Sequence, residues 1–192
     1  MTPCSRRSVL PLFIALVLAA CGPAATGGGG GRSAAGAQAP DFTLRDYEGR
    51  QVSLAEHFGK RVVLLDFWAT WCVPCEAEMP HLERLYQRYR DQGFVIYAVA
   101  MDGPETVASV GPLARRLGVT FPVLLDEETR VTAIYNPHRT APLSVLIDRQ
   151  GRIVKTHQGY VAGDEVTLER EIAALVGAGA TAAPAPAPSA VK

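Results

Sequence analysis

The sequence lacks an excess of either charge, because 19 Lys and Arg residues balance 19 Asp and Glu residues among 192 in total. Without a positive excess, no long-range field draws the chain onto phosphate backbones, which excludes nucleic acid as a first partner class. Internal repeats with periods of about 20–50 residues are also lacking, so a solenoid or propeller is excluded. The length suits one medium-sized domain.

Cysteine is scarce, with four residues at positions 4, 21, 72 and 75. Four are too few for a disulfide scaffold in a chain of this length. Cys72 and Cys75 form a Cys-X-X-Cys pair, but neither a second such pair nor a His-X3-His pattern accompanies them, so a zinc site would lack half of its ligands. No metal and no cofactor are therefore predicted, while zinc and an inert structural disulfide stay open as alternatives.

Long hydrophobic runs are limited to residues 9–20, which follow Arg6 and Arg7. The run is shorter than the roughly 20 apolar residues that a membrane-spanning helix requires, and its basic flank is typical of a signal peptide. A stable transmembrane segment remains the alternative. The Arg pair also resembles a twin-Arg export signal, with a plain basic flank as the other interpretation.

The end of this run, Leu18-Ala19-Ala20-Cys21, resembles the lipobox of bacterial lipoproteins. The resemblance implies that residues 1–20 are a lipoprotein signal peptide and that Cys21 is lipidated, unless an ordinary signal is cleaved there. The protein would then be anchored by its lipid to a membrane of the cell envelope, facing the periplasm or the cell exterior.

Two segments have compositions that disfavour folding. Residues 21–39 are rich in Gly and Ala, and residues 177–192 are rich in Ala and Pro. Neither segment can bury enough apolar surface to offset the entropy of ordering. We expect a flexible tether, a disordered tail, and a single folded domain over residues 40–176.

The middle of the chain alternates predicted strands and helices. Apolar, β-branched runs predict strands at 62–67, 94–100 and 143–147, the last continuing as a hairpin through 153–155. Helical periodicity predicts helices at 72–90, 105–117, 128–135 and 164–176. This order predicts an α/β fold in which a central mixed β-sheet is flanked by helices.

The Cys-X-X-Cys pair falls where a predicted strand turns into a predicted helix. Residues three apart on a helical turn face the same side, so Cys72 and Cys75 can close a disulfide. The helix N-terminus has unpaired N–H groups and a positive dipole end, which favour a thiolate at Cys72. Pro74 suits the first helical turn because it lacks an N–H.

Residues 63–75 (VLLDFWATWCVPC) resemble the active-site strand, turn and helix of the thioredoxin superfamily. Residues 76–80 (EAEMP) are similar to the TlpA/ResA-type branch, which comprises membrane-tethered thiol-disulfide oxidoreductases of the bacterial envelope. Thr140-Ala141-Pro142 resembles the cis-proline loop of that superfamily. The resemblance implies a thioredoxin-like fold over residues 41–176.

The resemblance also implies roles for these residues. Cys72 would attack a partner's disulfide, and Cys75 would resolve the mixed disulfide. A cis Pro142 would present the backbone of Thr140 and Ala141 to an incoming peptide. Trp71 would belong to the apolar rim that receives the partner, with core packing as its alternative.

Two carboxylates complete the predicted site. Asp66 ends an otherwise apolar strand and matches the buried acid of thioredoxins, which would exchange a proton with Cys75. Glu78 matches an acid of the ResA-type branch, with a solvated helix position as its alternative. The loop departs from the family in lacking a Gly before Thr140, which makes His138 and Arg139 candidates for tuning or partner selection, or plain loop residues.

Electron flow is predicted to run toward the partner, because Val73 and Pro74 supply no charge that would make the pair a strong oxidant. The resemblance implies a membrane electron donor of the DsbD or CcdA type, and disulfide-containing envelope proteins, apocytochrome c among them, as substrates. A disulfide oxidase or isomerase, a peroxiredoxin-like peroxidase, a copper-binding module and a redox-inactive adaptor are the alternatives. The peroxidase would need Thr at position 69, which is Ala, and the copper module a Cys-X3-Cys spacing.

Overall fold

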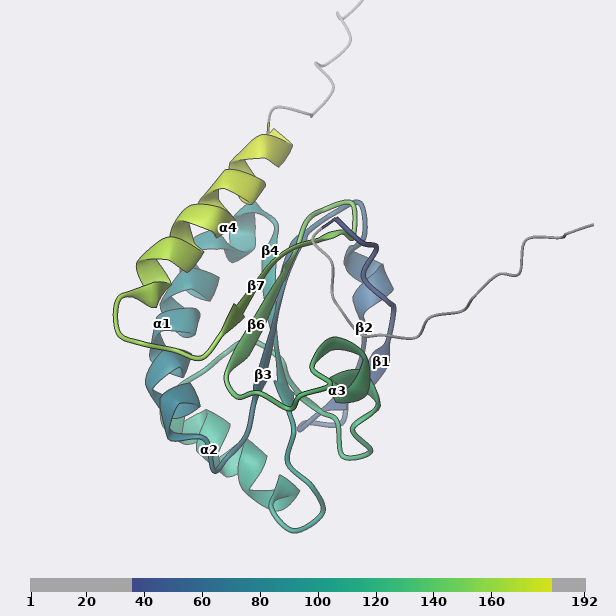
Figure 1. Cartoon of the computed structure of the whole chain (residues 1–192), viewed down its shortest axis with the longest axis vertical. Helices are drawn as coiled ribbons and strands as arrows, with labels where there is room; N and C mark the ends of the chain where they lie inside the picture. Colours follow the sequence, from purple (N-terminus) through teal and green to yellow (C-terminus); the bar gives the residue numbers. More distant parts are fainter. Residues whose placement is uncertain (1–35, 181–192) are drawn as a thin grey trace, which may run out of the picture. The chain divides into compact units, whose positions relative to one another are not determined.

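A seven-stranded mixed sheet organises residues 36–180, the part of the chain described by a computed structural model (Figure 1). Its order is β2-β1-β5-β4-β3-β6-β7. The three central strands β5, β4 and β3 are parallel, and the outer pairings are antiparallel. The strands span β1 (Thr43–Asp46), β2 (Gln51–Ser53), β3 (Val62–Trp68), β4 (Phe94–Ala100), β5 (Val123–Leu125), β6 (Leu143–Ile147) and β7 (Ile153–Gln158).

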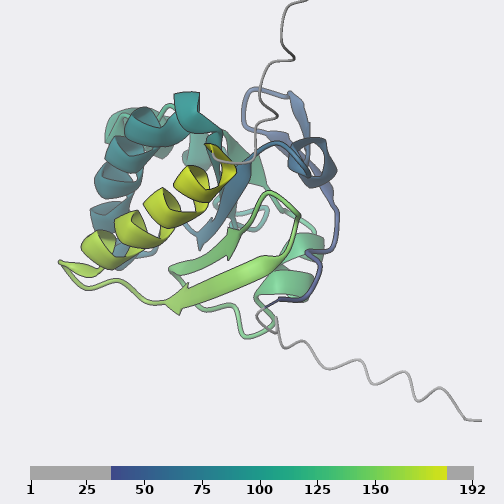
Figure 2. The same cartoon turned by 90° about the horizontal axis from the view of Figure 1, so that it is seen from above.

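Helices cover both faces of the sheet (Figure 2). One face packs against α1 (Val73–Tyr89), α2 (Val110–Leu117) and α4 (Asp164–Ala180). The other packs against the short helices η1 (Leu54–His57) and α3 (Arg130–Tyr135). This arrangement confirms the predicted fold class, a thioredoxin-like α/β domain with a central mixed sheet.

Strand β3 is buried along its whole length, so its alternating side chains pack into the cores on both faces of the sheet. Leu64 and Trp68 join the core beneath α1, α2 and α4, whereas Leu65 and Phe67 join the opposite core. Asp66 lies between Leu64 and Trp68 in the alternation. Its carboxylate therefore faces the layer that contains α1.

The predicted strands and helices are present, but three short strands were missed. Strands β1, β2 and β5 have only three or four residues each, and β1 and β2 are partly exposed. Such segments carry too little periodicity to predict a strand, and pairing within the sheet determines them.

Two helices begin later than predicted. The segment expected to be helical from 105 forms a 3₁₀ turn at Val107–Ser109 before α2 begins at Val110. Pro112 thereby falls in the first turn of α2, where a missing N–H costs nothing. Helix α3 begins at Arg130 because Thr129, with φ at 54°, has left-handed backbone.

The boundaries at both ends of the domain also differ from the prediction. Residues 36–39, assigned to the tether, pair with the start of β7: Ile153 N–H donates to the Ala37 carbonyl at 2.9 Å, and Ala39 is buried. Helix α4 runs to Ala180 rather than ending at 176. An established helix adds a residue at little cost, so four residues of the expected tail continue it.

Several predictions lie outside the described residues. They are the signal peptide at 1–20, the lipidation site Cys21, the tether up to residue 35, and the tail from 181 onward. Within residues 36–180, no helix has the length and apolar character needed to cross a membrane.

Candidate active site

The two cysteines lie at the start of α1 and are joined by a disulfide. Cys72 is the N-cap residue, and its sulfur accepts a hydrogen bond from the backbone N–H of Cys75 at 3.3 Å. A thiolate at this position would keep that bond and face the positive end of the helix dipole. The structure thus places both sulfurs as the spacing predicts.

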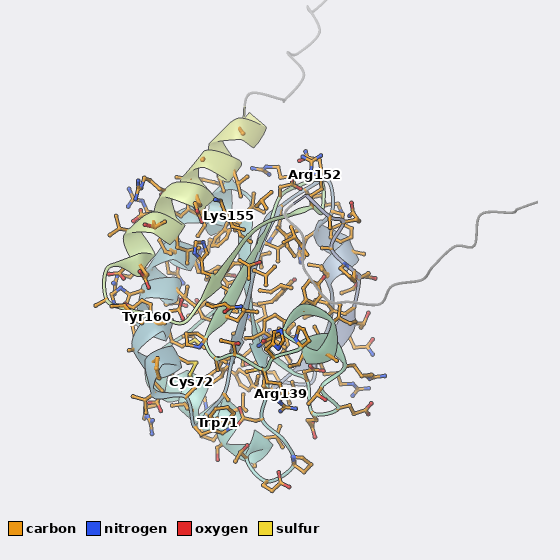
Figure 3. The ribbon with its side chains drawn as sticks, viewed as in Figure 1. Trp71, Cys72, Arg139, Arg152, Lys155 and Tyr160 are labelled. Atoms are coloured by element: carbon orange, nitrogen blue, oxygen red, sulfur yellow. A yellow bond between two sulfur atoms is a disulfide. The ribbon has the colours of Figure 1, made fainter. Side chains whose placement is uncertain are left out.

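Burial differs between the cysteines and their neighbours. Cys75 is 1% exposed and Cys72 is 4% exposed, so the disulfide is nearly enclosed. Trp71 and Val73 on either side of Cys72 are 61% and 76% exposed. Core packing is therefore excluded for Trp71, and an apolar surface borders the reactive sulfur. Figure 3 shows Trp71 and Cys72 together at one end of the sheet.

The turn before Cys72 is held by a residue that sequence reasoning missed. Asp102 lies two residues after the end of β4 and is buried, and its carboxylate accepts hydrogen bonds from the backbone N–H of Thr70 at 3.0 Å and from the Thr70 hydroxyl at 2.5 Å. A buried strand that ends in a carboxylate was the available signal. Asp102 thus fixes the segment that positions the attacking sulfur.

We expect Asp102→Ala to destabilise the protein by about 1–3 kcal/mol, because two donors on half-buried Thr70 lose their acceptor. Urea unfolding measures this loss, and the alkylation rate of reduced Cys72 should change as its turn loosens. Asp91→Ala is the matched control, because Asp91 is 91% exposed with an ion pair of 3.9 Å to Arg90. Equal stability of the two variants would contradict this role.

The proline loop reaches the same end of the sheet. The Ala141–Pro142 peptide bond is cis, as the resemblance implies. The next residue, Leu143, pairs with Phe67 near the end of β3, where the turn leading to Cys72 begins. Ala141 packs against the core cluster that contains both cysteines.

Buried Asn136 holds this loop in place. Its side-chain oxygen accepts from the Thr140 N–H at 2.9 Å, and its amide group donates to the Thr140 carbonyl at 2.7 Å. The loop is thereby fixed without the expected Gly. Arg139 adopts left-handed backbone with φ at 52°, the conformation that glycine adopts most readily.

His138 and Arg139 are both exposed. Within residues 36–180, neither side chain has a hydrogen bond or ion pair. Arg139 lies at the same end of the sheet as Trp71 and Cys72, as Figure 3 shows. No contact of these two side chains within the described part of the chain tests their predicted role in tuning the disulfide or selecting a partner, so that role stays a prediction.

Asp66 is 1% exposed and lies beneath the active-site end of β3. The hydroxyl of Ser144 donates to its Oδ1 at 3.2 Å. Burial raises the pKa of Asp66 to about 7, against a smaller lowering by the Ser144 hydrogen bond. Because burial disfavours the charged form, this carboxylate can gain or lose a proton near neutral pH. Ser144 itself gave no sequence signal, because it lies within an apolar strand.

Glu78 is 6% exposed, so the solvated helix position considered for it is wrong. It lies one helical turn after Cys75, on the same face of α1. Burial, together with the smaller effects of the charges of Asp66, Asp164 and Glu165, raises the pKa of Glu78 to about 9. Glu78 therefore holds its proton at neutral pH more firmly than Asp66 does.

Metal binding has no support from the arrangement of side chains. In the described part of the chain, no three His, Cys, Asp or Glu side chains are grouped so that they could hold a metal ion. Cys72 and Cys75 are bonded to each other. What the arrangement can do chemically is exchange a disulfide next to two proton-binding acids.

Comparisons with known proteins agree with this chemistry. The chain matches the AhpC/TSA family over residues 35–156. It is 44% identical over 125 residues to the thiol-disulfide oxidoreductase ResA of Halalkalibacterium halodurans, which covers 65% of this chain and 69% of that protein. ResA of Geobacillus thermodenitrificans is 40% identical over 138 residues, covering 72% of this chain and 77% of that protein.

Solved structures show the same likeness. A Chlorobium tepidum protein described as a thiol:disulfide interchange protein DsbE superposes with a TM-score of 0.69 at 33% identity, covering 74% of this chain and 98% of that one. The family match spans more than half of the chain, and these relatives are named for one activity. The chain therefore belongs to the AhpC/TSA family of thioredoxin-like proteins and is a thiol-disulfide oxidoreductase.

Proposed function

We propose that the enzyme reduces disulfides in exported proteins of the bacterial envelope. The observation that carries the proposal is the pair itself: Cys72 caps α1 and accepts the Cys75 N–H, beside the exposed Trp71. The helix terminus favours an ionised Cys72 sulfur in the reduced enzyme.

The proposed reaction has two exchanges. The Cys72 thiolate attacks a partner disulfide, and the partner's other sulfur leaves as a thiolate that takes a proton from water. Cys75 then loses its proton and attacks the Cys72 sulfur, which releases the second partner sulfur. The enzyme dithiol is oxidised to a disulfide, and the partner disulfide is reduced to two thiols.

The buried acids would serve the second exchange. Cys75 must be deprotonated to attack, yet it is 1% exposed and cannot pass its proton directly to bulk water. Asp66 faces the layer of α1 that contains Cys75, and its raised pKa makes it a base of suitable strength near neutral pH. The charge of Asp66 helps to raise the pKa of Glu78, so Glu78 would stay protonated while Asp66 acts as the base.

A partner would dock on the apolar surface around the disulfide. Trp71, Val73 and Val161 are strongly exposed apolar residues. Val161 follows Gly159, whose N–H donates to the Pro142 carbonyl at 2.8 Å, so its loop adjoins the cis-proline loop. The backbone of Thr140 and Ala141 would pair with an extended segment of the partner.

The direction of electron flow is tested by the reduction potential of the Cys72–Cys75 pair. Equilibration of the full chain with glutathione buffers, read by thiol alkylation, should give a value below about −150 mV, toward the thioredoxin value of about −270 mV. A value above about −150 mV, toward the DsbA value of about −120 mV, would instead identify a disulfide oxidase.

The cellular setting is part of the same proposal. A lipid on Cys21 would hold the domain at the membrane. A membrane electron donor of the DsbD or CcdA type would reduce the Cys72–Cys75 disulfide of the oxidised enzyme back to the dithiol. Apocytochrome c is one substrate of the proposed class. Labelling of the expressed protein with a fatty-acid analogue, compared between the natural chain and Cys21→Ser, tests the anchor.

A further inference from the structure

A row of polar side chains crosses the sheet from the active site toward solvent. Asp66 on β3 lies directly opposite Ser144 on β6, and Ser144 lies directly opposite His157 on β7. Directly opposed residues of antiparallel strands have Cβ atoms about 5 Å apart on the same face. Exposure rises along this row, from 1% at Asp66 and 3% at Ser144 to 35% for the His157 side chain.

A cavity of about 360 Å³ adjoins this row on the side of α4. Its walls include Glu78 and Ser144 on the inside and His157, Glu165 and Thr167 toward solvent. Among the described residues, its lining lacks Trp71, both cysteines and Pro142, so a partner on the apolar surface would not fill it. Polar walls and this volume suit several water molecules.

The inner wall of the cavity has an unsatisfied acceptor. Oε2 of Glu78 is buried and has no hydrogen-bond partner among residues 36–180. A buried carboxyl oxygen without a partner is costly unless water reaches it. The cavity therefore connects Glu78 with the outside of the domain, and it reaches Asp66 through Ser144, which lines the cavity and donates to Asp66.

His157 stands at the outer end of this connection, surrounded by groups from several elements. From α4, the Glu171 carboxylate oxygen Oε2 lies 2.7 Å from the His157 Nε2. Asp164 and Glu165, also on α4, line the cavity. From β7, Lys155 approaches the same Glu171 at 3.9 Å and lies beside α4 in Figure 3. Glu78 faces the cavity from α1.

We propose that the cavity and His157 form the route by which the proton removed from Cys75 leaves the buried acids for solvent. This route rests on the proposed function. Asp66 takes the proton of Cys75 as the disulfide closes, and water in the cavity carries the proton to the imidazole of His157. Bulk water then receives it from His157, and Asp66 is again ionised. Imidazole suits this task because one of its ring nitrogens can accept a proton while the other donates one.

The route is tested on the second exchange alone. Reduced full-length enzyme carrying Cys4→Ser and Cys21→Ser, so that the pair supplies the only thiols, reacts with 5,5′-dithiobis(2-nitrobenzoate). Attack by Cys72 on the reagent and then by Cys75 on the mixed disulfide each releases one coloured thiolate. We expect His157→Gln to slow the second release about tenfold near pH 7 and to leave the first unchanged, a smaller effect than the roughly hundredfold or more of a group that exchanges protons with the reacting atoms themselves. Added imidazole should restore the second rate.

His81→Gln is the matched control. His81 lies 3.3 Å from Glu165 and so also links a histidine to α4, but it is not part of the cavity lining. This variant should retain both rates, and thermal unfolding should show that each variant is folded. An unchanged second rate in His157→Gln, or a slowing that imidazole does not reverse, would overturn the route.

Asp66→Asn separates the route from the function on which it rests. If this variant slows the second exchange and His157→Gln does not, Asp66 acts as the base but the proposed route through His157 is wrong. If Asp66→Asn also leaves the second exchange unchanged, the proposed role of the acid itself is wrong. A slow second exchange in both variants, with imidazole restoring only His157→Gln, supports the route.

Discussion

Cys75→Ser is expected to stop turnover while leaving a partner covalently attached to Cys72. Cys72 can still attack, but no neighbouring thiol can release the mixed disulfide. An intramolecular thiol acts at an effective concentration far above that of external thiols, so disulfide reduction should fall by about a thousandfold or more. Non-reducing electrophoresis of envelope extracts would show the trapped complexes, and insulin reduction would measure the loss.

Cys72→Ser is the matched control for this experiment. Cys75 is 1% exposed and lies inside α1, so it should capture almost no partner when it is the remaining thiol of the pair. If the two variants trapped equal amounts of the same partners, Cys72 would not be the attacking sulfur. The partners identified with Cys75→Ser would also show whether apocytochromes are among the substrates.

Asp66→Asn is expected to stabilise the oxidised protein at alkaline pH. The pKa of Asp66 lies at about 7 in the folded state because of burial, against about 4 in an unfolded chain. Between these values the folded state keeps a proton that the unfolded state has lost, so the stability of the natural protein falls as pH rises from about 4 to 7. Above this window the whole cost of the buried charge remains.

The expected gain for Asp66→Asn at pH 8.5 is about 2–4 kcal/mol in the free energy of unfolding. Urea unfolding at pH 8.5 and at pH 3 measures it, and the gain should nearly vanish at the lower pH, where Asp66 is protonated in the folded state and mostly protonated in the unfolded chain. Ser144→Ala is the control, because it removes the hydrogen bond to Asp66 but keeps the titrating group. A gain that is the same at both pH values would contradict a raised pKa of Asp66.

The cost of a buried carboxylate points to its use. Asp66 replaces an apolar side chain in the core beneath α1, next to Leu64 and Trp68 in the strand alternation. A protein selected for stability alone would carry an apolar residue there. The two predictions for Asp66→Asn, higher stability and a slower second exchange, describe the same trade-off between stability and activity.

Much of the fold was predictable because its signals are local. The apolar runs of β3 and β4 and the periodicity of α1 and α4 lie within single segments, and the structure has these elements nearly as predicted. The short strands β1, β2 and β5 were missed because partners on other strands stabilise them. Their sequences alone carry no comparable pattern.

The reactive pair was also predictable, for the same reason. The spacing of Cys72 and Cys75 and the start of α1 are properties of a few consecutive residues, and they determine that the sulfurs meet at a helix N-terminus. The cis peptide bond at Pro142 followed from a resemblance rather than from physical reasoning, because the sequence of an X-Pro pair does not decide its isomer.

Only the tertiary structure decided how the acids behave. Asp66 and Ser144 are 78 residues apart in sequence. The pKa of Glu78 is raised in part by the charges of Asp164 and Glu165, which lie on a helix near the other end of the chain. Asp102 likewise holds Thr70 across 32 residues of sequence, whereas Asn136 binds Thr140 only four residues away within a loop that has no periodic pattern. Local sequence determines where a sulfur lies on a helix, but the dielectric surroundings of a carboxylate come from residues that folding alone brings to it.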